Sequence, residues 1–226
     1  MYSKKKIKLA VLASGSGTNL QSIIDQYQQG LLDVEIGMVI SNNPAAGALE
    51  RAEQAGINNI CINHRDYSSR EEFDRAVVAT LREVGVELVV LAGFMRILSA
   101  VFLQAFPQRI INIHPALLPA FPGLHVQRQA LEYGAKFSGC TVHLVDSGVD
   151  TGPIIAQAVV PIFTDDSEET LAARILEQEH KIYPQVIQWF AEDRVKIVNR
   201  QVQISHCKNI ASTLINPTID EEPVRE

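Results

Sequence analysis

The sequence is poor in cysteine, and the few cysteines it has exclude two common roles. Its 226 residues include three, Cys61, Cys140 and Cys207, which lie far apart and form no Cys-x-x-Cys pair. An odd number of widely spaced cysteines fits neither a disulfide framework nor a zinc site. The histidines show no zinc-type spacing with one another or with cysteine either. We therefore expect no metal and a reducing compartment, the cytoplasm.

Long hydrophobic runs and an excess of positive charge are also missing. The longest purely apolar run, residues 88–95, is far shorter than the roughly 18 residues that a membrane span needs. The apolar stretch that follows residues 4–6, all lysine, is interrupted by Lys8, which is untypical of an export signal. The formal net charge of −6 argues against a broad nucleic-acid surface. We expect a soluble protein that acts on small molecules, without a membrane or nucleic acid as partner.

The hydrophobic pattern that is present alternates between two kinds of segment. Apolar runs typical of buried strands lie at residues 7–13, 34–40, 58–62, 86–91 and 109–111. Segments with helical spacing or helix start signals lie at residues 20–27, 46–55, 68–83, 100–105, 124–133 and from 165 onward. Residues 136–145 and 153–162 add a strand pair. This order predicts an α/β domain with a doubly wound, mostly parallel sheet and helices on both faces.

A glycine-rich turn follows the first predicted strand. Residues 14–19 read Ser-Gly-Ser-Gly-Thr-Asn and lead into a helix, the local order of a phosphate site. A dinucleotide fingerprint would have a third glycine where Leu20 stands, and a Walker A loop would need a Gly-Lys-Ser/Thr that is absent. The turn therefore favours a monophosphate over NAD or ATP, with a plain tight turn as the alternative.

Asn112 and His114 form the most suggestive pair in the chain. They lie two residues apart at the end of a predicted strand, so their side chains point the same way. An amide donor beside an imidazole suits a reaction in which negative charge develops on an oxygen. A carboxylate would hold the ring and favour its charged form, and the loop at residues 146–152 offers Asp146 and Asp150. The sequence does not distinguish the two aspartates, and a calcium loop, the alternative, lacks EF-hand spacing.

Ligands of doubly wound sheets bind beyond the carboxyl ends of the strands. Four polar segments are expected at those ends, at residues 14–19, 41–43, 95–98 and 112–114. We predict that they line one cleft.

Several motifs, in the same order along the chain, resemble the phosphoribosylglycinamide formyltransferases, a folate-dependent formyltransferase family. The matching stretches are residues 14–20, 93–98, 112–115, 118–119 with 121–125, 139–152 and 178–180. The resemblance covers residues 7 to about 198. It implies a Rossmann-like formyltransferase fold, with residues 1–200 as a single domain and residues 201–226 as a loosely ordered tail.

The resemblance also implies an activity. It is the transfer of the formyl group of 10-formyltetrahydrofolate, as cosubstrate, to the amine of phosphoribosylglycinamide in purine biosynthesis. It further implies a monomer or weak homodimer. A formyltetrahydrofolate hydrolase, a methionyl-tRNA formyltransferase and an inactive ligand-binding module remain as alternatives. The first two would need an additional domain, and the third would be expected to lack part of the catalytic trio.

The resemblance also implies roles for individual residues. The implied catalytic trio is Asn112, His114 and Asp150. The implied substrate-binding residues are Gly17, Thr18, Asn19 and Glu179. The implied cosubstrate-binding residues are Arg70, Met95, Arg96, Ile97, Leu98, Asn112, Asp146 and Val149. The sequence departs from the family at three positions, where relatives often carry Ser, Lys and His: Ala116, Ala120 and Gln127.

Overall fold

A seven-stranded sheet forms the centre of the computed structural model, which describes residues 5–208, 212–214 and 216–217. Its strands are β1 (Ile7–Leu12), β2 (Val34–Ser41), β3 (Asn59–Cys61), β4 (Leu88–Leu91), β5 (Ile110–His114), β6 (Phe137–Leu144) and β7 (Ile154–Pro161). Their order is β3-β2-β1-β4-β5-β6-β7. The strands from β1 to β5 pair in parallel, whereas β6 and β7 are antiparallel to their neighbours. The predicted α/β class and the mostly parallel sheet are confirmed.

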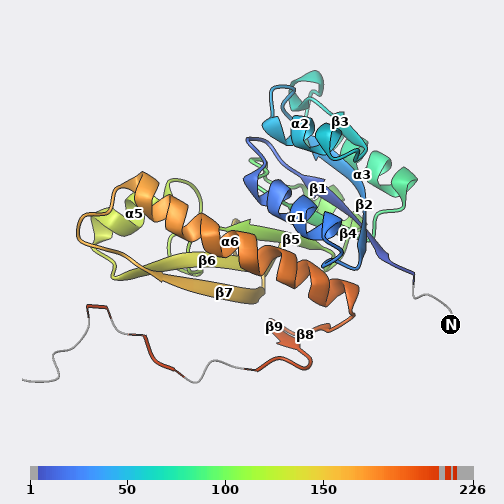
Figure 1. Ribbon diagram of the computed structural model, residues 1–226. Coiled ribbons are helices and arrows are strands. Elements are labelled where there is room, and N and C mark those ends of the chain that lie inside the picture. Colours follow the sequence, from blue (N-terminus) through green and yellow to red (C-terminus); the bar gives the residue numbers. More distant parts are fainter. Residues whose placement is uncertain (1–4, 209–211, 215, 218–226) are drawn as a thin grey trace, which may run out of the picture.

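Helices cover both faces of this sheet (Figure 1). They are α1 (Thr18–Gln28), α2 (Gly47–Gln54), α3 (Arg70–Val84), α4 (Ala100–Ala105), α5 (Val126–Tyr133) and α6 (Glu168–Ala191), with a 3₁₀ turn η1 (His64–Asp66). Successive side chains of β1 enter different cores, because neighbouring residues of a strand point to opposite faces. Leu9 and Val11 pack with α1 and α6, while Ala10 and Leu12 pack with α3 and α4.

The strand order indicates where a ligand can bind to the sheet. The chain leaves β1 toward β2 and β3, and later returns to place β4 and β5 on the other side of β1. The carboxyl ends of β1 and β4 therefore flank the point where the order reverses, which is where ligands bind in such sheets. Because β6 runs antiparallel to β5, it places His143 opposite Asn112 and Thr141 opposite His114.

A hairpin follows α6, where the sequence led us to expect the end of regular structure. Strands β8 (Val195–Val198) and β9 (Gln201–Ile204) form a separate antiparallel sheet. The predicted tail is therefore wrong for residues 201–204. The alternation of apolar and polar residues in both strands is a signal that could have predicted them. Most of the remaining tail, residues 209–211, 215 and 218–226, lies outside the described residues.

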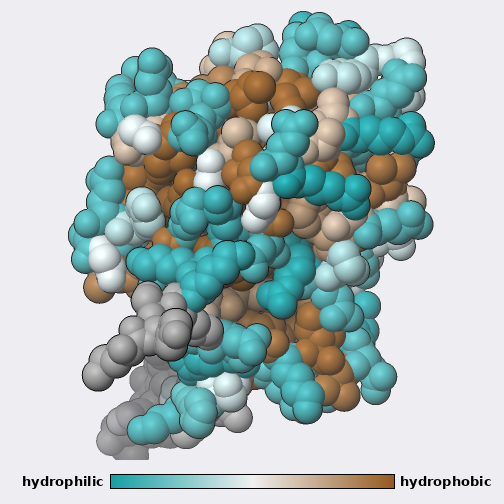
Figure 2. All heavy atoms as spheres, turned by 90° about the vertical axis from the view of Figure 1, so that its right-hand side faces the viewer, coloured by the Kyte–Doolittle hydropathy of each residue, from teal (hydrophilic) through white to brown (hydrophobic). Residues whose placement is uncertain are grey.

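The surface mixes polar and apolar side chains. Figure 2 shows hydrophilic residues over much of one face, with hydrophobic residues between them. Within the described ranges, every helix is too short or too polar to cross a membrane.

Tyr183 connects α6 to the middle of the sheet. Its side chain is fully buried, and its hydroxyl lies 2.8 Å from the carbonyl oxygen of Leu91 and 3.2 Å from that of Ile111. These carbonyls belong to the neighbouring strands β4 and β5. The Tyr183 hydroxyl therefore donates to carbonyls of two strands directly beside Asn112.

We predict that Tyr183→Phe lowers the free energy of unfolding by about 1–2 kcal/mol, because a buried hydrogen bond is lost while the ring keeps its packing. Urea unfolding of the two proteins measures the difference. Tyr133→Phe is the matched control, since that ring is 83% exposed and should cost little. Equal losses in the two variants would contradict this role for the Tyr183 hydroxyl.

Candidate active site

The glycine-rich turn builds the start of α1. Gly17 precedes the helix with a φ of 75°, a conformation that favours glycine. A Cβ at this position would lie 2.8 Å from the Cα of Ala48, so the start of α2 leaves no room for a side chain. No side chain of the described residues caps α1, and its first turn carries no acidic residue. The backbone N–H groups of this turn can therefore bind an anion.

Asn19 and Glu179 connect this turn to α6. The Asn19 Nδ2 donates to Glu179 Oε2 at 2.7 Å, and the Glu179 side chain is 6% exposed. Burial raises the pKa of Glu179 above its ordinary value, and the hydrogen bond from Asn19 offsets part of this shift. The structure thus brings these two predicted substrate-binding residues, far apart in sequence, into direct contact.

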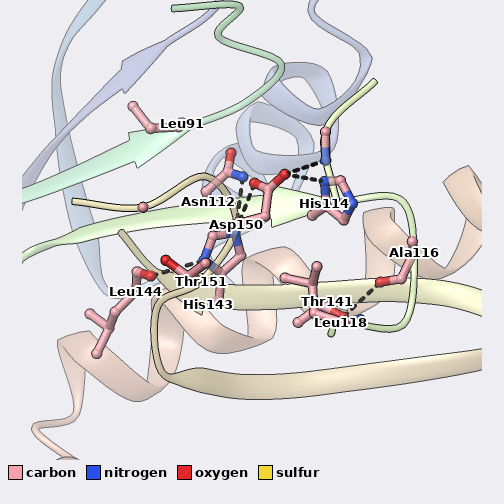
Figure 3. A network of polar contacts seen from close by, with 12 residues as sticks. Leu91, Asn112, His114, Ala116, Leu118, Thr141, His143, Leu144, Asp150 and Thr151 are labelled. Atoms are coloured by element: carbon pink, nitrogen blue, oxygen red, sulfur yellow. Dashed lines mark hydrogen bonds and ion pairs between the residues drawn. The ribbon is translucent and has the colours of Figure 1, made fainter. Parts of the chain in front are cut away.

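His114 and Asp150 meet at the end of β5. The distance from His114 Nδ1 to Asp150 Oδ2 is 3.3 Å, and the two side chains are 5% and 14% exposed. Figure 3 shows the carboxylate of Asp150 between His114 on one side and Asn112 and His143 on the other. Asp146, the alternative partner in the sequence, instead accepts hydrogen bonds from the Gly148 N–H at 3.1 Å and the Thr151 hydroxyl at 2.6 Å. The structure therefore distinguishes the two aspartates.

Both ring nitrogens of His114 face acceptors. The Nε2 lies 2.9 Å from the carbonyl oxygen of Phe121, and a carbonyl oxygen can only accept. The Nε2 must therefore carry a proton, while Nδ1 faces the carboxylate of Asp150. Only the imidazolium has a proton on each nitrogen and can donate to both acceptors at once.

His143 has the opposite character. Its Nδ1 lies 2.9 Å from the carbonyl oxygen of Leu144 and must donate to it. Burial lowers the pKa of His143 below its ordinary value, so the ring is neutral at neutral pH and its Nε2 can accept. The amide of Asn112 lies 3.1 Å from this Nε2 and is the donor.

His143 was not among the site residues predicted from the sequence. The pairing register of β5 and β6 brings it opposite Asn112, and the sequence does not state that register. The hydrophobic run that precedes His143 was a signal that it lies in a buried strand.

The loop that carries Asp150 is held in a particular backbone conformation. Asp150 has a φ of 54°, which aspartate adopts more readily than most residues. Its Oδ2 also accepts from the Gly123 N–H at 2.9 Å. At Gly152 a Cβ would collide with the carbonyl oxygen of Leu144, so the return to β7 requires glycine.

The turn at residues 115–125 lies against β6. Thr141 is fully buried; its hydroxyl donates to the carbonyl oxygen of Ala116 at 2.7 Å and accepts from the Leu118 N–H at 3.0 Å (Figure 3). Ala116, one of the family departures, is itself fully buried. The turn that provides the Phe121 carbonyl and the Gly123 N–H is thus fixed to the sheet.

The first two residues of the 95–98 segment, Met95 and Arg96, border a separate pocket. Met95 and Ile97 are 66% and 55% exposed, Leu98 is buried, and the Nε of Arg96 is buried without a hydrogen-bond partner among the described residues. A pocket of about 450 Å³ is lined by Ser14, Asn42, Asn43, Pro44, Asn63, His64, Arg65, Met95 and Arg96. It joins three of the four segments predicted to share one cleft, whereas Asn112 and His114 do not line it.

Two further predicted cosubstrate-binding residues lie at the surface. Arg70 forms an ion pair with Glu71, its neighbour in the chain, at 3.6 Å. Val149 is 48% exposed at the tip of the Asp150 loop. Within the part of the chain that the structure describes, no three histidine, cysteine or acidic side chains group in a way that could hold a metal ion.

Comparison with known sequences finds one family over most of the chain. Residues 7–187 match the family model described as formyl transferase. The phosphoribosylglycinamide formyltransferase of Escherichia coli is 47% identical over 191 residues, which are 84% of this chain and 90% of that protein. The trifunctional purine biosynthetic protein adenosine-3 of Drosophila melanogaster is 50% identical over 189 residues. These are 83% of this chain but 14% of that protein, so the chain spans a small part of the trifunctional relatives.

Comparison with solved structures agrees. The glycinamide ribonucleotide transformylase 1 of Symbiobacterium toebii superposes with a TM-score of 0.89 at 51% identity, over 90% of this chain and 97% of that chain. The phosphoribosylglycinamide formyltransferase of Coxiella burnetii superposes with a TM-score of 0.85 at 43% identity, over 88% of this chain and 94% of that chain.

The raised pKa of Glu179 predicts a pH-dependent change in stability. Between pH 4.5, the ordinary pKa of this carboxyl, and the raised pKa of the folded state, the folded protein binds more protons at Glu179 than the unfolded chain does. The free energy of unfolding therefore falls as pH rises through this range. We expect Glu179→Gln, which keeps an acceptor for Asn19, to remove this fall.

Urea unfolding at pH 4 and pH 8 measures the effect. The gain in stability of the Gln variant over the natural protein should be larger at pH 8. Glu177→Gln is the control, because Glu177 is an exposed carboxylate on the same helix. An equal difference at both pH values would contradict the raised pKa.

Proposed function

The chain belongs to the formyl transferase family, and on this premise we propose that it transfers a formyl group from 10-formyltetrahydrofolate to the amine of phosphoribosylglycinamide. The product would be the formylated ribonucleotide of purine biosynthesis, with tetrahydrofolate released. The observation that carries the proposal is the contact of His114 with Asp150 at 3.3 Å, with Asn112 on the same strand.

We propose that the neutral amine attacks the formyl carbon directly, without a covalent bond to the enzyme. As the new C–N bond forms, the formyl oxygen becomes negative and accepts hydrogen bonds from the His114 imidazolium and the Asn112 amide. His114 then gives a proton to the folate nitrogen as the old C–N bond breaks. The attacking nitrogen loses one proton in turn, which restores the imidazolium. Asp150 keeps the ring oriented and charged throughout.

In this mechanism the substrate has to displace the Phe121 carbonyl from His114. It accepts the Nε2 proton of His114 at 2.9 Å in the free protein. A substrate oxygen that uses this proton must replace the carbonyl as acceptor. The carbonyl thus keeps the proton on Nε2 satisfied until the substrate binds.

The proposed binding residues form two sets, one for the ribonucleotide and one for the folate cosubstrate. We propose that Gly17, Thr18 and Asn19 hold the phosphate at the start of α1, with Glu179 beside the sugar. Their support is the uncapped helix start and the contact of Asn19 with Glu179. For the folate cosubstrate we propose the following residues: Arg70, Met95, Arg96, Ile97, Leu98, Asn112, Asp146 and Val149. The exposed apolar side chains of Met95, Ile97 and Val149 suit a flat aromatic ligand.

We further propose that residues 1–200 act as one domain in the cytoplasm, as a monomer or a weak homodimer, without a metal. Incubation with 10-formyltetrahydrofolate, with and without phosphoribosylglycinamide, tests the reaction. Formyl transfer that requires the ribonucleotide supports the proposal. Deformylation that ignores the ribonucleotide indicates a hydrolase, and binding without turnover indicates a ligand-binding module.

We predict that Asp150→Asn lowers kcat at least about a hundredfold, the usual contribution of a positioned acid or base, with little change in KM for either substrate. The amide keeps the size of the side chain but removes the charge that favours the imidazolium. Steady-state kinetics measures both constants. Asp165→Asn, at an exposed aspartate before α6, should leave kcat unchanged. Full turnover by the Asp150 variant would remove this residue from the mechanism.

A further inference from the structure

We propose that Arg200, in the turn of the β8–β9 hairpin, is a positioning residue for the reaction, because it fixes the loop that carries Asp150. The inference rests on the proposed function, since it assigns Arg200 to the same site. Arg200 does not touch the reacting groups and acts through Asp150.

The contact is direct. The Nη2 of Arg200 donates a hydrogen bond to the carbonyl oxygen of Thr151, the residue after Asp150. Such a bond from a guanidinium is stronger than one between neutral groups. The Thr151 side chain also donates to Asp146 Oδ1 at 2.6 Å, so Arg200 contacts a residue that already holds the loop together.

The loop needs such support because packing does not supply it. Residues 147–149 and Thr151 are exposed, so the segment that positions Asp150 has few buried side chains. Asp150 also has a φ of 54°, a backbone conformation that costs free energy for a residue other than glycine. Hydrogen bonds on two sides therefore define its place: the Gly123 N–H donates to the carboxylate, and Arg200 donates to the adjoining carbonyl.

The hairpin is attached to the protein independently of the loop. Val195, Ile197, Val202 and Ile204 pack against the hydrophobic core on the α6 side of the sheet. Arg194 closes the base of the hairpin with a hydrogen bond from its Nε to the carbonyl oxygen of Ser205 at 2.8 Å. Figure 1 shows the hairpin beneath α6 and close to β7. Arg200 thus connects the loop to a fixed element.

A pocket lies between the hairpin and the start of β7. It has a volume of about 580 Å³ and is lined by Ile154, Arg200, Gln201, Val202 and Gln203. Because packed side chains do not fill this space, only a long side chain can reach from the hairpin turn to the Thr151 carbonyl. Arginine has the length and the donor to reach the Thr151 carbonyl.

We expect Arg200→Ala to lower kcat roughly three- to tenfold, the effect of losing one charge-assisted hydrogen bond that orients a catalytic group. The KM for phosphoribosylglycinamide should stay unchanged. Arg200→Lys keeps a cationic donor and should recover most of the activity. Lys196→Ala removes an exposed cation from the same hairpin and should leave kcat unchanged. Thermal unfolding of each variant checks that the fold is kept.

A double-mutant cycle with Asp150→Asn tests the route of the effect, measured by single-turnover kinetics with enzyme in excess. If Arg200 acts through Asp150, Arg200→Ala should cost little or nothing in the Asp150→Asn background. The same loss in both backgrounds would overturn the inference. Full activity of Arg200→Ala, where Asp150→Asn has lost most of its activity, would also overturn it. Full activity of Asp150→Asn itself would instead overturn the proposed mechanism.

Discussion

The ion pair between His114 and Asp150 is the interaction on which the architecture of the site depends. His114 ends the last parallel strand, whereas Asp150 belongs to a loop after the first antiparallel one. Strand β6 ends beside the start of β5, so the loop has to fold back along β5 to reach the histidine. That return accounts for the positive φ at Asp150 and for the glycine at position 152, which lies against the Leu144 carbonyl.

The two histidines near Asp150 differ in their hydrogen-bond partners. His143 is buried between a carbonyl that takes its one proton and an amide that donates to its other nitrogen, so burial keeps it neutral. His114 is just as buried but faces a carboxylate and a carbonyl, two acceptors that the neutral ring cannot satisfy together. A neutral acceptor that holds Asn112 thus lies beside a ring whose two nitrogens both face acceptors.

Sequence patterns predicted the strands, the helices and the pairing of Asn112 with His114 on one face, because each depends on local periodicity. The choice between Asp146 and Asp150 depends on a loop conformation and on a hydrogen bond from Gly123, which no local pattern contains. His143 was missed because its place opposite Asn112 depends on a strand register. Arg200 lay in the expected tail, where the short alternating strands gave a weaker signal than the long apolar runs of the sheet.

The turn at residues 115–125 contacts both members of the ion pair. The Phe121 carbonyl lies 2.9 Å from the Nε2 of His114, and the N–H of Gly123, two residues later, donates to Asp150. Movement of this short segment therefore changes the surroundings of the ring and the orientation of the carboxylate together. Thr141, through its bonds to Ala116 and Leu118, extends that linkage into the sheet. A substitution in this turn accordingly affects His114 and Asp150 together and not one of them alone.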